Sequence, residues 1–131
     1  MEIGKLALLH IENKKLLVAI EKGENTFYVP GGKRKIGESD IQALAREIKE
    51  ELSVEIVPET IKYYRTFRAH AHGNPLGTEV KMTCYTGKFK GVPKPSGEIE
   101  TLLWITSKNI PQATPVGKLL LNDLKQKTLI D

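Results

Sequence analysis

The sequence predicts one domain of the α/β class, in which a mixed sheet is flanked by helices. The chain has 131 residues, about the length of one ordinary domain, so a single hydrophobic core is expected over residues 1–131. Most segments rich in β-branched and aromatic residues come before or after one well-marked amphipathic helix, and a second helical pattern ends the chain. This order favours an α/β or α+β architecture, which by itself says nothing about chemistry.

The composition is typical of a globular protein, because 40% of the residues are apolar and 27% are charged. The net charge of +4 favours anionic ligands but does not separate nucleotides from nucleic acid or membranes. Cys84 is the only cysteine, so no internal disulfide can form, and we expect it to fill the buried face of a strand. No export signal is visible and the longest apolar run, 16–20, is too short for a bilayer, so we expect a cytoplasmic protein without a membrane partner.

Strand patterns cover much of the chain outside the two helices. Residues 3–11 and 16–20 predict a β-hairpin around the turn-prone sequence ENKK, and 26–29 is a short strand that ends at Pro30. A loop rich in proline and glycine is expected before the last strand. The strands expected after the first helix are 54–57, 60–72, 78–89 and 101–106.

Two helices are predicted from caps and apolar spacing. Ser39 caps a helix from about residue 40 to residue 52, and Thr114 with Pro115 begins the second helix. Apolar residues at helical spacing should face the core, and Trp104 is also expected there. The apolar positions are Ile41, Leu44, Ala45, Ile48 and Leu52 in the first helix, and Val116, Leu119, Leu120 and Leu124 in the second.

Three glutamates share one side of the first helix, with Glu51 at the edge of the apolar arc and Glu50 furthest from it. A solvated polar face is the ordinary interpretation of such a pattern. However, Glu47 is followed four residues later by Glu51, a like-charge pair that costs roughly 0.2 to 0.5 kcal/mol in a helix. Clustered carboxylates suit a hard divalent cation such as Mg²⁺ or Mn²⁺, and Arg46 is placed to orient one of them. No CxxC pair or HExxH run indicates zinc.

The spacing around this helix resembles the Nudix hydrolase family. The family box is glycine, five residues, glutamate, seven residues, then Arg-Glu, an aliphatic residue, any residue, Glu-Glu, any residue, glycine and an aliphatic residue. Positions 32–54 fit this pattern except Ser53, which stands where the family usually has glycine at the helix end. The matching residues are Gly32, Glu38, Arg46, Glu47, Ile48, Glu50, Glu51 and Val54.

The resemblance implies an α/β/α sandwich that hydrolyses a nucleoside diphosphate linked to another group, with help from Mg²⁺ or Mn²⁺. It implies that Glu47, Glu50 and Glu51 are metal ligands, together with a backbone carbonyl of Gly31 or Gly32. It also implies catalytic roles for Glu47, Glu50 and for Arg46, which holds Glu47, and it makes Glu38 a brace of the loop against the helix beside the substrate. Lys33 and Arg34 are candidates for contact with a phosphate, and an ordinary solvated loop is the alternative for both.

The general base stays open, because members of the family use either a box glutamate or an acidic residue from a later loop. Glu98 is the candidate from the later loop, with Glu100 as the fallback and a plain surface carboxylate as the alternative. His70 and His72 lie two apart on an expected strand, where exposure is the simpler prediction. Tyr28 is a candidate for stacking on a base, whereas core packing is the simpler reading of Phe27 and Tyr85.

The substrate is less well determined than the reaction. The region after the box, RAHAHG, carries neither the proline nor the tyrosine that marks some subfamilies. A compact chain of this kind looks most like a nucleoside triphosphate pyrophosphohydrolase that releases a monophosphate and pyrophosphate. ADP-ribose or nucleotide-sugar hydrolysis and a non-catalytic nucleotide-binding module are the alternatives, and a homodimer is left open. A basic nucleic-acid-binding domain has only the charge in its favour, so no nucleic acid polymer is expected as a partner.

Overall fold

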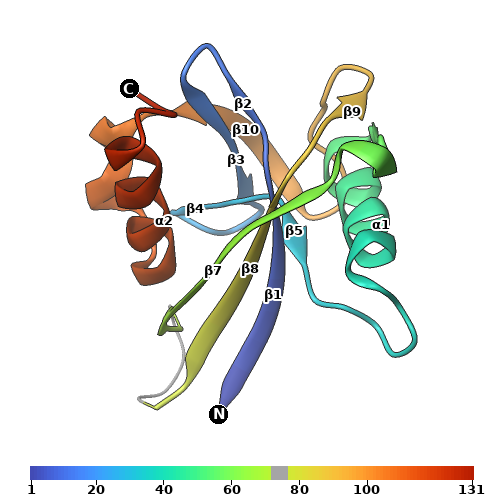
Figure 1. Ribbon diagram of the computed structural model, residues 1–131, viewed down its shortest axis with the longest axis horizontal. Coiled ribbons are helices and arrows are strands. Elements are labelled where there is room, and N and C mark those ends of the chain that lie inside the picture. The colour runs from blue at the N-terminus through green and yellow to red at the C-terminus, as the bar shows by residue number, and fades with distance from the viewer. Residues whose placement is uncertain (72–76) are drawn as a thin grey trace.

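Two helices lie on opposite sides of a central layer of strands, as the computed structural model shows (Figure 1). The structure describes residues 1–71 and 77–131. Helix α1 (Asp40–Leu52) lies on one side and helix α2 (Pro115–Gln126) on the other. The predicted class, a mixed α/β arrangement with helices flanking the strands, is confirmed.

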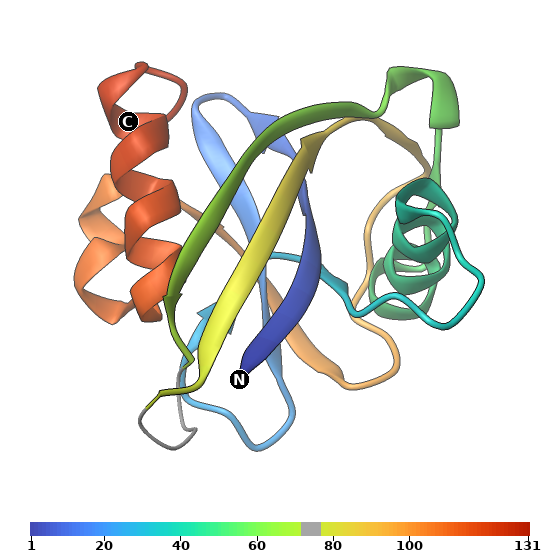
Figure 2. The same cartoon turned by 60° about the horizontal axis from the view of Figure 1, so that its bottom comes forward.

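One sheet has the strand order β5, β1, β8, β7. Strands β1 and β8 are parallel and pair over eight residues, whereas β5 and β7 are antiparallel to their neighbours. Figure 2 shows β1, β8 and β7 side by side. The four strands are β5 (Gly31–Gly32), β1 (Glu2–Leu9), β8 (Glu79–Thr86) and β7 (Lys62–His70).

A second sheet runs in the order β10, β3, β2, and β4 also pairs with β3. Its strands are β10 (Ile99–Ile105), β3 (Lys15–Glu21), β2 (Ile11–Glu12) and β4 (Phe27–Tyr28). A third, minimal pair joins β6 (Glu55–Ile56) to β9 (Phe89–Lys90). Two 3-10 helices, η1 (Pro58–Thr60) and η2 (Ser107–Gln112), complete the described elements.

The predicted hairpin between residues 3–11 and 16–20 is wrong in its extent. The chain changes sheets at His10, so only β2 turns back onto β3, and β1 instead pairs with β8 in parallel. Residues 6–9 of β1 and 16–19 of β3 are buried in succession, and such a run does not indicate which strand will pair with which. The position of the sheet change therefore could not be inferred from the run of apolar residues.

Helix α1 has the predicted limits, because both of its ends have strong local signals. Ser39 and Gln42 form a capping box at the N-terminus, in which each side chain bonds the backbone N–H of the other residue. The buried face is rotated slightly from the predicted arc: Ala43 is fully buried, whereas Ile41 is exposed. The prediction for Ile41 is therefore wrong, because the buried face of the helix passes through Ala43 and Leu44 and leaves Ile41 outside it.

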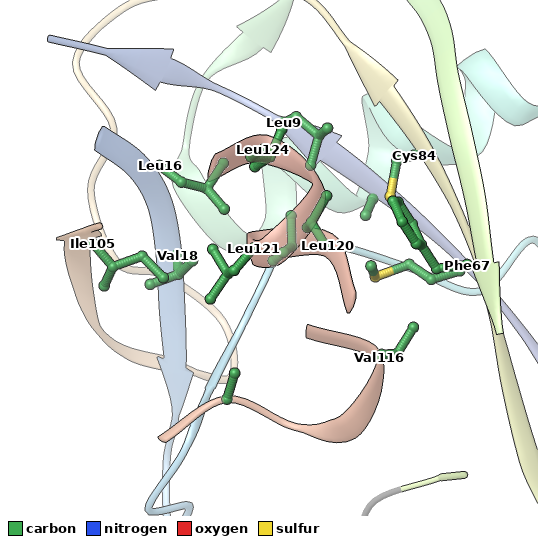
Figure 3. Close-up of a cluster of buried hydrophobic side chains, with 14 of the residues drawn as sticks. Leu9, Leu16, Val18, Phe67, Cys84, Ile105, Val116, Leu120, Leu121 and Leu124 are labelled. Atoms are coloured by element: carbon green, nitrogen blue, oxygen red, sulfur yellow. The ribbon is translucent and has the colours of Figure 1, made fainter. Parts of the chain in front are cut away.

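The apolar core forms two clusters, one under each helix. In Figure 3, Leu121 of α2 points toward Val18 of β3, and Leu120 and Leu124 lie in the same cluster. Each fully buried leucine contributes roughly 2 kcal/mol by removing apolar surface from water. Cys84 also belongs to this cluster and is fully buried, as predicted.

Two further residues predicted in the core lie at the surface. Leu119 lies on the flank of the α2 stripe and is exposed. Trp104 is 42% exposed, because β10 is the end strand of its sheet. Its indole contacts the ring of His10, at a centroid distance of 5.8 Å. Neither exposure is visible in the local pattern, since both depend on where the neighbouring element ends.

One buried acid on α2 is enclosed by donors from other segments. Asp123 accepts hydrogen bonds from the Tyr64 hydroxyl at 2.6 Å and from Arg65 Nη1 at 2.7 Å, and Lys127 Nζ lies 3.3 Å away. Burial by itself raises the Asp123 pKa, but the hydrogen bonds from Tyr64 and Lys127 outweigh it and lower the pKa. This closed network ties α2 to β7. In the described part of the chain, no helix has the length and apolarity needed to cross a membrane.

Candidate active site

The three box glutamates of α1 line a cavity of about 560 Å³ together with the loop that precedes the helix. The cavity brings together most of the residues predicted from sequence, including Glu98 from the distant loop before β10. Lys5 and Glu21, which the sequence analysis did not single out, also line it. The full lining is Lys5, Glu21, Gly31, Gly32, Lys33, Glu47, Glu50, Glu51, Gly97 and Glu98.

Arg46 connects the loop to the helix through its whole guanidinium group. Its Nε and Nη2 atoms donate to the two carboxylate oxygens of Glu38, each at 2.8 Å, and Nη2 also donates to the Lys33 carbonyl oxygen. Its Nη1 atom donates to Glu47 Oε1 at 2.8 Å. A fork of this kind fixes both partners in orientation, so Arg46 holds Glu47 in a defined position at the cavity wall.

Glu38 joins the loop to α1 through Arg46, and the role beside the substrate that the resemblance implies for it stays a prediction. The hydrogen bonds from Arg46, and then the one from the Lys35 N–H at 2.7 Å, lower the Glu38 pKa to about 2. Both carboxylate oxygens are thereby used inside the protein, and Glu38 does not line the cavity. The stability that this group contributes is present above pH 4.5 and is lost only as the pH falls toward 2.

Gly31 brings the loop backbone against both β1 and Glu51. Its φ of 147° lies in the region that favours glycine, and a Cβ atom there would lie 2.0 Å from the Leu6 carbonyl oxygen. Its N–H donates to Glu51 Oε1 at 2.9 Å. At the next position, a Cβ on Gly32 would lie 2.5 Å from the carboxyl carbon of Glu47. Only glycine leaves room for the glutamates to lie directly against this backbone.

Glu51 is a carboxylate withdrawn from water with few partners. Burial is the main cause that raises its pKa to about 7, against the lowering effect of the Gly31 N–H, and the nearby charge of Glu47 raises it further. Lys5 attracts the charged form but does not compensate for the burial. The position therefore strongly favours an added positive charge, since a cation would stabilise the ionised carboxylate.

The donor set is of the kind that Mg²⁺ and Mn²⁺ prefer, because it consists of carboxylate oxygens and nearby backbone carbonyls. Glu50 is exposed, and its Oε1 lies 3.8 Å from Arg46 Nη1. Glu47 and Glu51 each hold one oxygen in an internal hydrogen bond. Among the described residues, no three Asp, Glu, His or Cys side chains converge on one point. The residues present fit a divalent cation by their chemistry and by the space that the two glycines leave.

The end of α1 is tied to the loop that carries Glu98. The N–H groups of Lys94 and Ser96 donate to the carbonyl oxygens of Leu52 and Glu51, and the Ser96 hydroxyl donates to the Glu50 carbonyl oxygen. These are carbonyls that a helix end leaves without partners. The contacts therefore cap the helix, and they also fix the start of the segment that leads to Glu98.

Ser53 adopts the left-handed conformation predicted for the family's usual glycine. Its φ of 57° and ψ of 33° are those of the left-handed region, and its N–H donates to the Lys49 carbonyl oxygen. The Ser53 hydroxyl also bonds the Ser96 hydroxyl at 3.1 Å. The departure from the family pattern therefore leaves the helix exit in place and adds one contact to the Glu98 loop.

Lys5 is the most informative residue that the sequence analysis missed. It lies on β1, far from the box in sequence, and it is half-buried. Burial lowers its pKa, whereas Glu51, Glu21 and Glu47 raise it. A lysine inside an otherwise apolar strand pattern was the one available signal, because such a residue normally needs an acidic partner or a ligand when it is withdrawn from water.

The remaining candidates lie around a second cavity of about 410 Å³ between the sheet and α2. Tyr28, Phe27 and the exposed His70 line it, and Lys5 Nζ lies 4.8 Å from the centroid of the Tyr28 ring. Phe27 is buried in the core cluster, as predicted. His72 lies outside the described residues.

Two further residues of the site region are engaged elsewhere. Arg34 lies outside the carboxylate cavity, and its Nη1 donates to Asp40 at 3.0 Å. Tyr85 is half-buried and donates its hydroxyl to the other oxygen of Asp40. Tyr85 is therefore a packing residue at the start of α1, and the side chain of Arg34 is directed to the same acid.

Known proteins were compared with this chain by sequence and by structure. The family model described as the NUDIX domain matches residues 5–123. A search of curated proteins found no match.

Solved structures share the fold at low sequence identity. The E. coli ORF135 protein is 22% identical, with 95% of this chain and 91% of that chain covered and a TM-score of 0.73. A MutT NUDIX hydrolase from Burkholderia pseudomallei is 21% identical, with 93% and 97% covered and a TM-score of 0.76. A UDP-X diphosphatase is 18% identical, with 98% of this chain and 61% of that chain covered and a TM-score of 0.66.

The family match spans most of the chain and contains the loop, the helix and the carboxylates described above. The neighbouring structures have the same fold. The chain therefore belongs to the Nudix hydrolase family, whose members hydrolyse nucleoside diphosphates linked to another group.

Proposed function

We propose that this protein is a cytoplasmic nucleoside triphosphate pyrophosphohydrolase that uses Mg²⁺ or Mn²⁺ and releases a nucleoside monophosphate and pyrophosphate. The observation that carries the proposal is the juxtaposition of Glu47, Glu50, Glu51 and Glu98 around one cavity, beside a backbone kept open by glycine. Water attack on a phosphorus atom needs charge neutralisation and a positioned base, and this cavity offers groups for both.

Each residue has a distinct part in the proposed reaction. Glu47, Glu50 and Glu51 would hold the cation, together with a carbonyl of Gly31 or Gly32. When bound, the cation would neutralise charge on the diphosphate and lower the pKa of a water molecule. Arg46 keeps Glu47 oriented through the hydrogen bond at 2.8 Å, and Glu38 keeps Arg46 in place through two more.

Two side chains at the cavity act on water and phosphate in this proposal. Glu98 accepts a proton from the attacking water, because it lines the cavity opposite α1 and is not committed to an ion pair with another described residue. Lys33 contacts a phosphate oxygen, since it is exposed at the cavity edge directly after the glycine pair.

The apolar cavity next to the carboxylates has a size and lining suited to the nucleoside. It encloses about 410 Å³, and the half-buried ring of Tyr28 lines it with Lys5 Nζ 4.8 Å from the ring centroid. A base stacked on an aromatic ring gains roughly 1 to 3 kcal/mol without discrimination between bases. This fits a nucleotide as the small-molecule partner and leaves the identity of the base to other contacts.

The test is turnover of a defined panel in the presence of Mg²⁺. The panel contains the nucleoside triphosphates, oxidised deoxynucleotides, nucleotide sugars, ADP-ribose and dinucleoside polyphosphates, and the products are identified by chromatography. We expect the triphosphates to give monophosphate and pyrophosphate, with activity lost in EDTA and restored by Mn²⁺. Orthophosphate as the first product would contradict the proposed position of cleavage.

Two alternatives are decided by the same panel. A UDP-X diphosphatase shares the fold, so nucleotide sugars and ADP-ribose are the next substrates to consider. A nucleotide-binding module without turnover is the second alternative, and the retained carboxylates Glu47, Glu50 and Glu51 argue against it. Binding of triphosphates without any product, in Mg²⁺ and in Mn²⁺, would establish the binding module.

A further inference from the structure

A groove of about 550 Å³ lies on the face of the sheet that is turned toward the start of α1. Its floor is formed by neighbouring positions of β1, β8 and β7, where Gly4 pairs with Lys81 and Thr83 pairs with Thr66. Gly4 has no side chain and those of Thr66 and Thr83 are short, which leaves the hollow open, and a Cβ on Gly4 would touch nothing within 4 Å. The lining is Gly4, Lys5, Leu6, Lys33, Arg34, Asp40, Thr66, Lys81 and Thr83.

The groove carries a strong excess of positive charge. It is lined by four basic residues and by a single acid, Asp40, whose two oxygens accept hydrogen bonds from Arg34 and Tyr85. The ammonium groups of Lys33 and Lys81 form no ion pair within 4.0 Å with any described residue. Lys5 contributes to the wall of the groove, but its side chain lies on the other face of the sheet with that of Met82, and its Nζ lies over the Tyr28 ring. Two basic groups around the hollow are therefore left without an ion-pair partner in the part of the chain that the structure describes.

Lys81 is the decisive residue of this groove. It is half-buried on β8. The side chains of Met82 and Cys84 point into the core on one face of this strand, so that of Lys81 points to the other face. Exposed lysines are ordinarily solvated and need no explanation. Lys81 is half-buried and forms no ion pair with a described residue, and the one acid of the groove, Asp40, is already bonded to Arg34 and Tyr85, so an anionic ligand is the natural partner of Lys81.

The groove is continuous with the proposed active site through two shared residues. Lys5 and Lys33 line the groove, the carboxylate cavity and the apolar cavity. The three hollows therefore meet at two lysines. A substrate whose nucleoside lies in the apolar cavity and whose diphosphate lies at the carboxylates has its remaining group directed to the groove.

We infer that the groove lined by Lys33, Arg34 and Lys81 binds a negatively charged group of the substrate beyond the scissile anhydride. The protein then prefers substrates whose second group is anionic, such as a further phosphate or an acidic sugar, over those whose second group is neutral. The inference rests on the proposed function for the placement of the anhydride. It adds a charge requirement that the carboxylate site alone does not impose.

The test uses three substrates with the same nucleoside: UTP, UDP-glucuronate and UDP-glucose. UDP-glucuronate and UDP-glucose differ by one carboxylate on the second group, so their ratio isolates the charge. We expect kcat/KM for UTP and for UDP-glucuronate to exceed that for UDP-glucose by at least about tenfold, with the advantage shrinking in 0.5 M NaCl as salt screens the lysines. Equal values, or a preference for the neutral sugar, would overturn the inference.

Variants locate the effect in the groove. Lys81→Gln should reduce the ratio of kcat/KM between UDP-glucuronate and UDP-glucose by about fivefold or more, and Lys81→Arg should retain it. Lys125→Gln removes the same charge from an exposed position on α2 and should leave the ratio unchanged. An unchanged ratio in Lys81→Gln, with the native circular dichroism spectrum, would remove the groove from the binding site.

Failure of the proposed function gives a different pattern from failure of this inference. If none of the three uridine nucleotides is hydrolysed, their dissociation constants are measured by calorimetry with Ca²⁺. Tighter binding of UTP and UDP-glucuronate than of UDP-glucose, lost in Lys81→Gln, would support the groove while the hydrolysis fails. Equal binding, or no binding of any of them, would contradict the groove.

Discussion

Asp123 on α2 and Glu51 on α1 are both acids withdrawn from water on a helix that packs against the strands, yet their surroundings are opposite. Asp123 is enclosed by Tyr64, Arg65 and Lys127, and its pKa is lowered. Glu51 has one hydrogen bond from the Gly31 N–H among the described residues, and its pKa is raised to about 7. Asp123 is ion-paired within the fold, whereas Glu51 is attracted only by Lys5, which does not compensate for its burial.

The difference separates an acid that stabilises the structure from one that is prepared for a ligand. A buried acid with all its donors adds to stability and has no capacity left for another cation. A buried acid without them lowers stability until a cation arrives, and this is a common property of functional sites. The same residue class therefore has opposite consequences on the two helices, and mutations should separate them.

The largest expected effect is on turnover when a carboxylate of α1 is neutralised. Glu51→Gln and Glu47→Gln should each lower kcat by at least about 100-fold, because each removes a charge that would stabilise the cation and the transition state. The measurement is steady-state hydrolysis of the best panel substrate in Mg²⁺. Glu24→Gln, at an exposed turn, is the matched control and should keep the wild-type rate. Wild-type rates in folded Glu51 and Glu47 variants would exclude the assigned roles.

The second effect is on the pH dependence of stability without a divalent ion. Because the Glu51 pKa is raised to about 7 in the folded state, its contribution is fully present below pH 4.5 and is lost as the pH rises through 7. The loss amounts to at most about 3 kcal/mol. Glu51→Gln should therefore gain stability relative to wild type between pH 5 and pH 8, measured by urea unfolding in EDTA. A difference that is independent of pH would show that the Glu51 pKa is the same in the folded and the unfolded protein.

The third effect concerns the acid on α2. Asp123→Ala should lower the free energy of unfolding by about 2 kcal/mol, because it leaves the Tyr64 hydroxyl and two cations without their acceptor. Urea unfolding at pH 7 measures the loss, and kcat of the folded variant should stay within about twofold of wild type. A large fall in kcat with unchanged stability would reverse the contrast between the two acids.

A smaller effect on turnover is expected from the loop carboxylate. Glu98→Gln should lower kcat by about tenfold or more if it accepts the proton of the attacking water, since general bases contribute at least that much. Glu100→Gln is the matched control, because it is two residues away on β10 and does not line the cavity. Equal losses in the two variants would remove Glu98 from the proposed role.

The smallest effect is at the end of α1. Ser53→Gly should raise the free energy of unfolding by up to about 1 kcal/mol, because glycine adopts the left-handed conformation without strain. Ser53→Ala keeps the strain and loses the hydrogen bond to Ser96, so it should be less stable than wild type. Urea midpoints of the three proteins separate the conformational contribution from the hydrogen bond. A stability of Ser53→Gly below that of wild type would show that the hydrogen bond outweighs the strain.

Local signals account for the part of the structure that could be predicted. Helix α1 was predicted to the residue because its cap, its apolar spacing and its left-handed exit all lie within fifteen consecutive positions. The site residues on the loop and on α1 follow from the same segment. The convergence of Glu98 on the cavity was expected only through the family resemblance, since no local rule connects it to α1.

The parts that could not be predicted depend on contacts between distant segments. Lys5 enters the site because β1 pairs with β5 at Leu6 and Gly32, which no pattern within β1 indicates. Trp104 is exposed because β10 ends its sheet, and β1 leaves the predicted hairpin because it pairs with β8. Periodicity shows which side of an element is apolar, but the neighbour across the sheet decides whether that side is covered.

Lys94 and Ser96 cap α1 through their backbone N–H groups, so the Glu98 loop and the helix end are ordered together. When the loop detaches, the last carbonyls of the helix lose their donors, and Glu50 and Glu51 become free to move with the frayed turn. The amide hydrogens of Lys94 and Ser96 should therefore exchange with solvent at rates that follow each other. Slow exchange at these two positions marks the molecules in which all four carboxylates are in place at once.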